Sequence, residues 1–411
     1  MNRVVITGMG VISPLGNNVE TFWGNLLNGK SGISTIDTLD VSNSKTKIGG
    51  IVRNFDAKER WGTKEARHLD RFSQFALAAA EEAMSSSQLN LEKIDRERFG
   101  VYVGSGIGGI QTLIDNVNIL NERGPNRVSP TLVPMMIPNA AAAQISIKFG
   151  ALGPSLSPVT ACSIGNTSIG EAFNLIRIGD ADVMIAGGAE AAITTLSLAS
   201  FGNAKALSTK NDDPASASRP FDAKRDGFVM SEGAGILVLE SLEHAMRRNA
   251  PILCEVIGYG ASSDAYHMVA SHPEGTGAYM AMKNALRKAN LSPESIDVIS
   301  AHATSTQVGD YSETLAIKKL FGDNAYRIPV TANKSMLGHM FGASGGVEAI
   351  ALVNSLRENI VPPTINLENP DPDCDLDYVS EGTRKMTLNI GLSNSFGFGG
   401  HNSAIVLKKY E

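Results

Sequence analysis

Cys162 lies at the junction between an extended segment and an apolar, helix-like run, in the stretch VTACSIGNTSIG (159–170). The thiolate is the reactive form of cysteine, and at neutral pH a free thiol with a pKa of about 8.5 is mostly protonated. A cysteine at the start of a helix faces unpaired N–H groups and the positive end of the helix dipole, which lower its pKa. The position therefore predicts an activated nucleophile, with a buried and inert thiol as the alternative.

The other two cysteines stand in less suggestive places. Cys254 lies within a predicted strand and Cys374 within a predicted loop, so both are expected to be inert. Three widely spaced cysteines form neither a zinc-binding pattern nor a disulfide framework, and they fit a reducing compartment.

Two histidines and a lysine stand in segments rich in small polar residues. His302 follows the strand-like VISA, and His339 ends the segment NKSMLGH (333–339), which also contains Lys334. Strand ends that face a crevice are the usual place for sites in α/β proteins. A lone histidine is more often structural, but a cysteine, two histidines and a lysine in such places together indicate an active site.

Three glycine-rich turns complete the candidate features. The segment NSFGFGGHN (394–402) can turn sharply enough to aim N–H groups at a developing oxyanion, although it could be only a tight turn. The G-x-G-x-x-G at 104–109 lacks the acidic residue of a dinucleotide site about 20 residues further on. The G-x-S-x-G at 342–346 lacks the strand of a hydrolase elbow and is interpreted as a glycine-rich helix start.

These residues must be positioned by an alternation of short β-branched runs and longer helical runs. The predicted strands are 3–9, 99–105, 182–188, 234–240, 297–303 and 403–409. The predicted helices are 71–87, 169–179, 277–290 and 345–358. Such alternation predicts an α/β fold with helices covering mixed or parallel sheets.

Two similar five-residue segments, called the echo below, indicate where the chain divides. PVTAC (158–162) and PVTAN (329–333) each precede a helix-like run. Chance could produce the match, but the shared context favours a duplicated α/β unit joined near residues 249–251. We therefore expect two domains, 1–250 and 251–411, whose packing brings Cys162 to the 333–342 segment.

Composition and charge argue against several classes of function. The 411-residue chain has a formal net charge of -6, which argues against non-specific nucleic-acid binding. Its N-terminus is predicted to be a strand and a turn, unlike a signal peptide. The most apolar region, 183–201, contains Glu190, so a membrane span is not expected. The sequence predicts a soluble, cytoplasmic protein.

With these features assembled, the chain resembles the β-ketoacyl-acyl-carrier-protein synthases of bacterial fatty-acid synthesis, especially the elongating type II enzymes. The resemblance spans nearly the whole length, and its segments are 4–16, VTAC, 219–235, HATST, NKSMLGH and NSFGFGG. It implies a thiolase-like fold of two similar α/β halves in αβαβα layers and a homodimer. It also implies an acyltransferase that joins an acyl chain to malonyl-acyl carrier protein with loss of carbon dioxide.

The resemblance also assigns roles to residues. Cys162 would accept the acyl chain, and neutral His302 and His339 would donate hydrogen bonds to the malonyl thioester oxygen. Lys334 would organise the site electrostatically, with Glu348 as its acidic partner. No metal or bound cofactor is expected, because the carrier protein supplies the phosphopantetheine arm.

Further positions carry over with supporting roles. Phe398 would act as a gate, and its N–H would join that of Cys162 in an oxyanion hole. Asp310 and Glu313 match acidic positions counted with the catalytic set. The substrate-binding positions would be Thr304 and Thr306 for the phosphopantetheine arm, Ile107 and Phe201 for the acyl tunnel, and Phe396. The positions that would meet the carrier protein are Lys64, Arg67, Arg127 and Lys205.

Four positions depart from the family pattern. Ala303 stands where glycine is usual, so a positive φ there would be strained. Ile164 replaces a small polar residue, His401 replaces a threonine in many members, and Val269 stands where threonine often faces the carrier. We expect Ile164 above all to set this enzyme apart, with acyl-length preference and carrier affinity affected.

Other functions fit parts of the pattern. A thiolase would carry a second cysteine in the glycine-rich C-terminal loop, and the loop here has none. An initiating synthase would pair cysteine with histidine and asparagine, whereas the second polar position here is His339, which favours elongation. A non-catalytic partner subunit would typically lack the cysteine. A cysteine hydrolase would release free acid without malonyl substrate.

Overall fold

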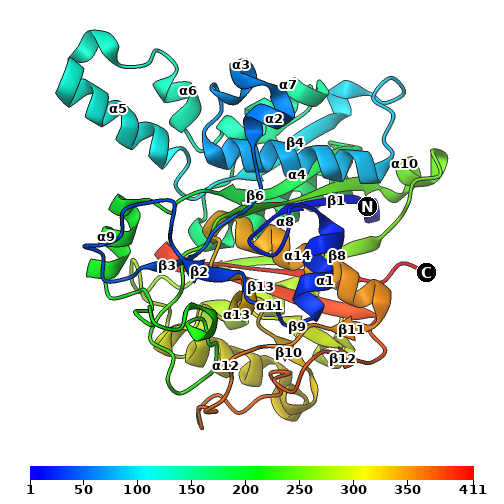
Figure 1. Ribbon diagram of the computed structural model, residues 1–411. Helices are drawn as coiled ribbons and strands as arrows, with labels where there is room; N and C mark the ends of the chain where they lie inside the picture. The colour runs from blue at the N-terminus through cyan, green and yellow to red at the C-terminus, as the bar shows by residue number, and fades with distance from the viewer.

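The computed structural model describes residues 1–411, and its main feature is a ten-stranded sheet (Figure 1). The strand order is β10-β9-β13-β14-β8-β1-β7-β6-β4-β5. The bounds are β1 (Val4–Ile12), β4 (Phe99–Gly104), β5 (Ser155–Leu156), β6 (Val183–Glu190), β7 (Gly233–Ser241), β8 (Cys254–Ser263), β9 (Val298–Ser300), β10 (Val330–Thr331), β13 (Ile390–Gly397) and β14 (His401–Lys408). Two small hairpin sheets pair β2 (Ile33–Thr35) with β3 (Ile48–Gly50) and β11 (Ile360–Val361) with β12 (Arg384–Lys385).

The main sheet consists of two five-stranded halves with the same strand directions. In the first half β1, β7 and β6 are successively antiparallel, and β6, β4 and β5 are parallel. In the second half β8, β14 and β13 are antiparallel, and β13, β9 and β10 are parallel. The halves join where β1 pairs with β8 and Val4 lies opposite Val256. This repetition confirms the predicted pair of similar α/β halves.

Helices form three layers around the sheets in Figure 1. Helices α4 and α7 cover the outer face of the first half, α8 and α14 lie between the halves, and α11 and α12 lie on the outer side of the second half. The αβαβα layering predicted from the family resemblance is confirmed. The bounds are α1 (Val19–Leu27), α2 (Ala57–Trp61), α3 (Thr63–Ala66), α4 (Arg71–Ser87), α5 (Ile110–Arg123), α6 (Leu132–Met136), α7 (Ala140–Phe149), α8 (Ile164–Ile178), α9 (Thr195–Asn203), α10 (Leu242–Arg247), α11 (Thr276–Ala289), α12 (Gln307–Phe321), α13 (Lys334–Leu337) and α14 (Ser344–Glu358).

Helix α4 shows how local sequence sets an element here. The Asp70 side chain caps the helix by accepting the N–H of Phe72, and the helix spans the predicted residues 71–87. Its apolar side chains, including Phe72 and Phe75, are fully buried against the first half of the sheet.

The central helices α8 and α14 meet at their N-terminal ends with almost no space between them. A Cβ atom added to Gly165 would lie 2.3 Å from the backbone nitrogen of Gly346, so only glycine permits this crossing. The close approach places the segment before α8, with Cys162, beside the segment before α14, with His339.

The sequence echo is displaced from the true structural repeat. Val330 and Thr331 form β10, whereas Val159 and Thr160 follow β5 rather than forming it. Short 3-10 helices lead into α8 and α14 at Ala161–Ser163 and Phe341–Ala343, and their first residues have φ of 50° and 46°. The structural counterpart of Cys162 is therefore Gly342 rather than Asn333. The echo is a coincidence within a genuine repeat.

The helices of the structure can be compared with two further predictions. Helix α8 begins at Ile164, five residues before the predicted 169, because its weak helix formers at 165–168 are buried against α14 and other central elements. None of the helices is both long and apolar enough to span a bilayer.

Candidate active site

Cys162 occupies the short 3-10 helix before α8 and is buried, with 6% of its surface exposed. The backbone N–H groups of Cys162 and Phe398 both lower the pKa of its thiol by hydrogen bonding. This is the arrangement expected of an oxyanion hole, since an oxygen attached near the sulfur would face the same two donors.

Burial is the largest influence on the pKa of the Cys162 thiol. Burial raises the pKa of Cys162 to about 12, although the charge of Lys334 opposes the shift and that of Glu190 adds to it. The prediction of a lowered pKa is therefore wrong, because desolvation of the thiolate outweighs the favourable dipoles and charge nearby.

His339 contacts the cysteine, and His302 lies beside His339. His339 Nε2 lies 3.0 Å from Cys162 Sγ, and the rings of His302 and His339 are 5.5 Å apart at 86°. Burial, reinforced by the charge of Lys334, lowers the pKa of each histidine well below its usual value. Both imidazoles are therefore neutral at physiological pH and can act as hydrogen-bond donors or acceptors.

Lys334 and Glu348 form a buried ion pair behind the histidines. Lys334 Nζ lies 2.6 Å from Glu348 Oε1 and 3.5 Å from His302 Nδ1, and both charged side chains are 1% exposed. Burial raises the pKa of Glu348 to about 7, and the lysine charge opposes this rise. An ammonium group can only donate, so Nδ1 of His302 accepts and its proton lies on Nε2.

The other ring has a different neighbour. His339 Nδ1 lies 3.2 Å from Ser344 Oγ. The same oxygen accepts the backbone N–H of Met340 at 3.0 Å. Phe341 and Phe228 hold the His339 ring from its sides, with centroids 4.9 and 5.3 Å away.

Two of the predicted acidic residues lie behind the His302 loop rather than at the reacting atoms. Glu313 accepts the N–H of His302 at 2.9 Å and that of Ala303 at 2.8 Å. Ala303 has a φ of 34°, so the predicted strain exists and these bonds hold it. Asp310 accepts the N–H of Ser305 at 3.1 Å and lies 3.5 Å from Arg225 Nε.

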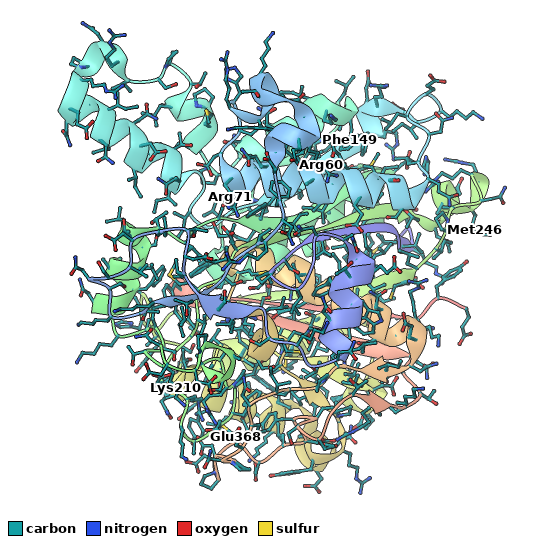
Figure 2. The ribbon with its side chains drawn as sticks, viewed as in Figure 1. Arg60, Arg71, Phe149, Lys210, Met246 and Glu368 are labelled. Carbon is teal, nitrogen blue, oxygen red and sulfur yellow. The ribbon has the colours of Figure 1, made fainter.

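A wider charge network supports this loop. Arg225 donates to the carbonyls of Thr306 and Gln307. Arg219 donates to Glu368 at 3.1 Å, and Glu368 is labelled in the lower part of Figure 2. Burial raises the pKa of Asp310 to about 7 although Arg225 opposes it. Asp310 and Glu313 thus position the loop, and neither lines the cavity.

A cavity of about 320 Å³ opens over Cys162. Several predicted residues line it, namely Cys162, His302, His339, Thr304, Thr306, Phe396, Phe398 and Lys205. Ile107 and Phe201 do not line the cavity but pack in the apolar cluster that contains Cys162. Of the predicted carrier-contacting residues, Lys64, Arg67 and Arg127 are exposed away from the cavity.

The four residues that depart from the family pattern lie in different environments. Val269 lines the cavity and is 46% exposed, and His401 is exposed beside Gly399. Ile164 is fully buried and lies outside the cavity, where its side chain fits a space left by Gly104, Gly188 and Gly342. The structure thus gives Ile164 a packing role and no contact with a substrate in this cavity.

Glu190 supports the site, although from the sequence it serves only as evidence against a membrane span. It lies at the end of β6 and is fully buried. Its Oε1 accepts from Ser105 Oγ at 2.8 Å and the Ile107 N–H at 3.1 Å. Its Oε2 accepts from the N–H groups of Gly106 at 2.8 Å and Gly342 at 3.1 Å. A single acid in an otherwise apolar strand was the signal for this role.

Ser344, Phe228 and Phe341 were also missed as site residues. Ser344 belongs to the segment at 342–346, which is a helix start as interpreted. Its position five residues after His339 was the available signal.

Comparisons with known proteins agree along the whole chain. The family description "Beta-ketoacyl synthase, N-terminal domain" matches residues 1–245, and "Beta-ketoacyl synthase, C-terminal domain" matches residues 253–368. The chain is 49% identical over 409 residues to a 3-oxoacyl-[acyl-carrier-protein] synthase 2 of Synechocystis, covering 100% of this chain and 98% of that protein. A protein of the same name from Staphylococcus aureus strain COL is also 49% identical, covering 100% of this chain and 99% of the relative.

Solved structures show the same likeness. A Burkholderia phymatum beta-ketoacyl synthase superposes with a TM-score of 0.93 at 33% identity, with both chains fully covered. A type II polyketide ketosynthase in complex with its acyl-carrier protein superposes with a TM-score of 0.92 at 36% identity, again over both full chains.

Proposed function

The chain belongs to the beta-ketoacyl synthase family, and from this premise we propose that it elongates acyl chains for fatty-acid synthesis. The reaction is a decarboxylating Claisen condensation between an acyl group held on Cys162 and malonyl-acyl carrier protein. The observation that carries the proposal is the 3.0 Å contact of Cys162 Sγ with His339 Nε2, beside His302 at the base of a cavity.

In the first half-reaction the Cys162 sulfur attacks the acyl thioester delivered on the carrier. The bond between the acyl carbon and the carrier sulfur breaks, and the thiol proton of Cys162 ends on the departing carrier thiol. The N–H groups of Cys162 and Phe398 stabilise the oxyanion of the tetrahedral intermediate.

In the second half-reaction malonyl-carrier occupies the cavity. His302 and His339, neutral because burial and Lys334 lower their pKa values, donate hydrogen bonds to its thioester oxygen. Carbon dioxide leaves, and the resulting enolate carbon attacks the acyl group on Cys162. The cysteine sulfur departs and takes up a proton, which restores the thiol and yields 3-oxoacyl-carrier.

Separate assays test the two halves of this mechanism. We expect Cys162→Ala to lose condensation by at least about a thousandfold. Mass spectrometry should find the acyl label of acyl-carrier on Cys162, and a label on Cys254 or Cys374 would overturn the assignment. His302→Ala and His339→Ala should each lower malonyl decarboxylation by about a hundredfold or more, and unchanged decarboxylation would refute their donor role.

The carrier would deliver its phosphopantetheine arm past Thr304 and Thr306, which line the cavity. Lys205 lines the same cavity and is exposed, which suits contact with an acidic carrier. Lys64, Arg67 and Arg127 would extend the contact across exposed surface.

A charge reversal tests this docking. Lys205→Glu should raise the KM for acyl-carrier with little change in kcat. Lys210→Glu is the matched control, since Lys210, which is labelled in Figure 2, lies five residues away and does not line the cavity. Equal effects of the two substitutions would contradict a specific role for Lys205.

The protein would act in the cytoplasm as a homodimer. Helices α5 and α6 project from the body in Figure 1 and expose Leu113, Val117, Leu120 and Val133. β5 is the last strand of the sheet, and its Leu156 is 52% exposed. Unpaired strand edges and exposed apolar side chains mark surfaces that associate. Light scattering should give the mass of two chains, and a monomer mass would refute this.

A further inference from the structure

We propose that Ser344 is a positioning residue that fixes the proton of His339 on Nε2, the ring nitrogen facing Cys162. The proposal rests on the proposed function, because a donor at Nε2 is useful there only for a reaction that develops negative charge on a substrate oxygen.

The buried hydroxyl of Ser344 needs a hydrogen-bond acceptor. This side chain is fully buried at the first residue of α14. Its oxygen accepts the N–H of Met340 at 3.0 Å, and its other polar contact is His339 Nδ1 at 3.2 Å. A serine hydroxyl has one hydrogen to donate, and a buried O–H without an acceptor is costly.

The hydrogen bond between the two side chains runs from the Ser344 hydroxyl to the His339 ring. His339 Nδ1 is the only acceptor in contact with the Ser344 hydroxyl, so the hydroxyl donates to Nδ1. A neutral imidazole carries one proton, which then lies on Nε2. Burial lowers the pKa of His339 well below its usual value, so a second proton on the ring is excluded.

The ring of His302 has a matching arrangement. Lys334 Nζ lies 3.5 Å from Nδ1 of that ring and can only donate. Two different donors, an ammonium group and a hydroxyl, therefore set the same tautomer on two rings whose centroids lie 5.5 Å apart. Both rings present an Nε2–H group to the site.

One chemical consequence concerns Cys162. An Nε2 atom that carries hydrogen has no lone pair for the thiol proton 3.0 Å away. His339 is therefore a donor to the thioester oxygen and not the base that deprotonates Cys162. The thiol proton passes to the departing carrier thiol, as the first half-reaction requires.

The test is Ser344→Ala, read by two independent measurements. Solid-state ¹⁵N NMR of sedimented, ¹⁵N-histidine-labelled enzyme distinguishes protonated from unprotonated ring nitrogens, and a His339→Gln variant identifies the signals. We expect the wild-type protein to show His339 protonated on Nε2, and Ser344→Ala to show a mixture of tautomers. Malonyl decarboxylation should fall between about tenfold and about a hundredfold in kcat, with KM little changed.

Ser335→Ala is the matched control. Ser335 is equally buried and also accepts one backbone N–H, that of Ile365 at 3.1 Å, but it has no hydrogen bond to a histidine. We expect this variant to keep the His339 tautomer and the wild-type decarboxylation rate, whatever its melting temperature.

Two results would overturn the proposal. One is an unchanged tautomer in Ser344→Ala, and the other is an unchanged decarboxylation rate. A wild-type enzyme that did not decarboxylate malonyl-carrier at all would instead refute the proposed function, and the NMR measurement would still report on the tautomer.

Discussion

The buried pair of Lys334 and Glu348 leads to a quantitative prediction about stability. Each side chain is 1% exposed and the charged atoms lie 2.6 Å apart. Lys334→Met removes the cation and leaves a buried carboxyl group without a partner, which should cost about 3–5 kcal/mol of unfolding free energy at pH 7. Replacing both residues, as Lys334→Met with Glu348→Leu, should bring the stability back to within about 1–2 kcal/mol of wild type, because no unpaired charge remains.

The pH dependence follows from the sign of the Glu348 shift. Burial raises its folded pKa to about 7, above its ordinary unfolded value. The folded state therefore binds the proton more tightly, and its contribution to stability falls as pH rises until the folded pKa is passed. In wild type the decline should end near pH 7. Without Lys334 the folded pKa rises further, so stability should keep falling by up to about 1.4 kcal/mol per pH unit between pH 7 and 9.

Urea unfolding followed by circular dichroism at pH 7, 8 and 9 measures both effects. Lys318→Met is the control, because its partner Asp375 is partly exposed and the pair should contribute at most about 1 kcal/mol. The reasoning is refuted if Lys334→Met costs no more than this control. It is also refuted if the double variant is no more stable than Lys334→Met alone.

Three further predictions concern other residues of the site. Because burial raises the Cys162 pKa to about 12, its alkylation by iodoacetamide should accelerate about tenfold per pH unit from pH 7 to 10, and a plateau near pH 7 would contradict this. Glu190→Gln should lower the unfolding free energy by about 2–4 kcal/mol in urea titrations, because one amide oxygen cannot accept the four bonds that the carboxylate accepts. Ile164→Ala should cost about 2–4 kcal/mol through cavity formation but leave the acyl-length profile of Cys162 labelling unchanged, and a changed profile would restore the specificity role expected from sequence.

The proposed catalytic residues could be predicted because each one follows a strand or precedes a helix. Cys162, His302, His339 and Lys334 all lie in such places, and the structure brings them together. The α/β alternation gave the fold class for the same reason, since apolar periodicity is a local property of the sequence.

Properties that depend on burial could not be predicted from the local sequence, because distant segments of the chain cause the burial. The pKa of Cys162 depends on desolvation by segments far along the chain, so the helix-start argument gave the wrong direction. Ile164 looked like a specificity residue because it follows the nucleophile by two positions, yet its side chain points into a space left by distant glycines. The echo at 329–333 matched in letters but not in register, because α13 lies between β10 and the counterpart of Cys162.

The Glu190 carboxylate has a consequence for how the protein can be divided. Glu190 belongs to the first half of the chain. Its carboxylate accepts hydrogen bonds both from the Ile107 N–H of the first half and from the Gly342 N–H of the second half. Cys162 comes from the first half, and His302, His339 and Lys334 come from the second. Under the proposed mechanism neither half alone carries all of these residues, so activity in a mixture of separately produced halves would report their correct association directly. The rate of the condensation reaction would therefore measure how much of the two halves has associated.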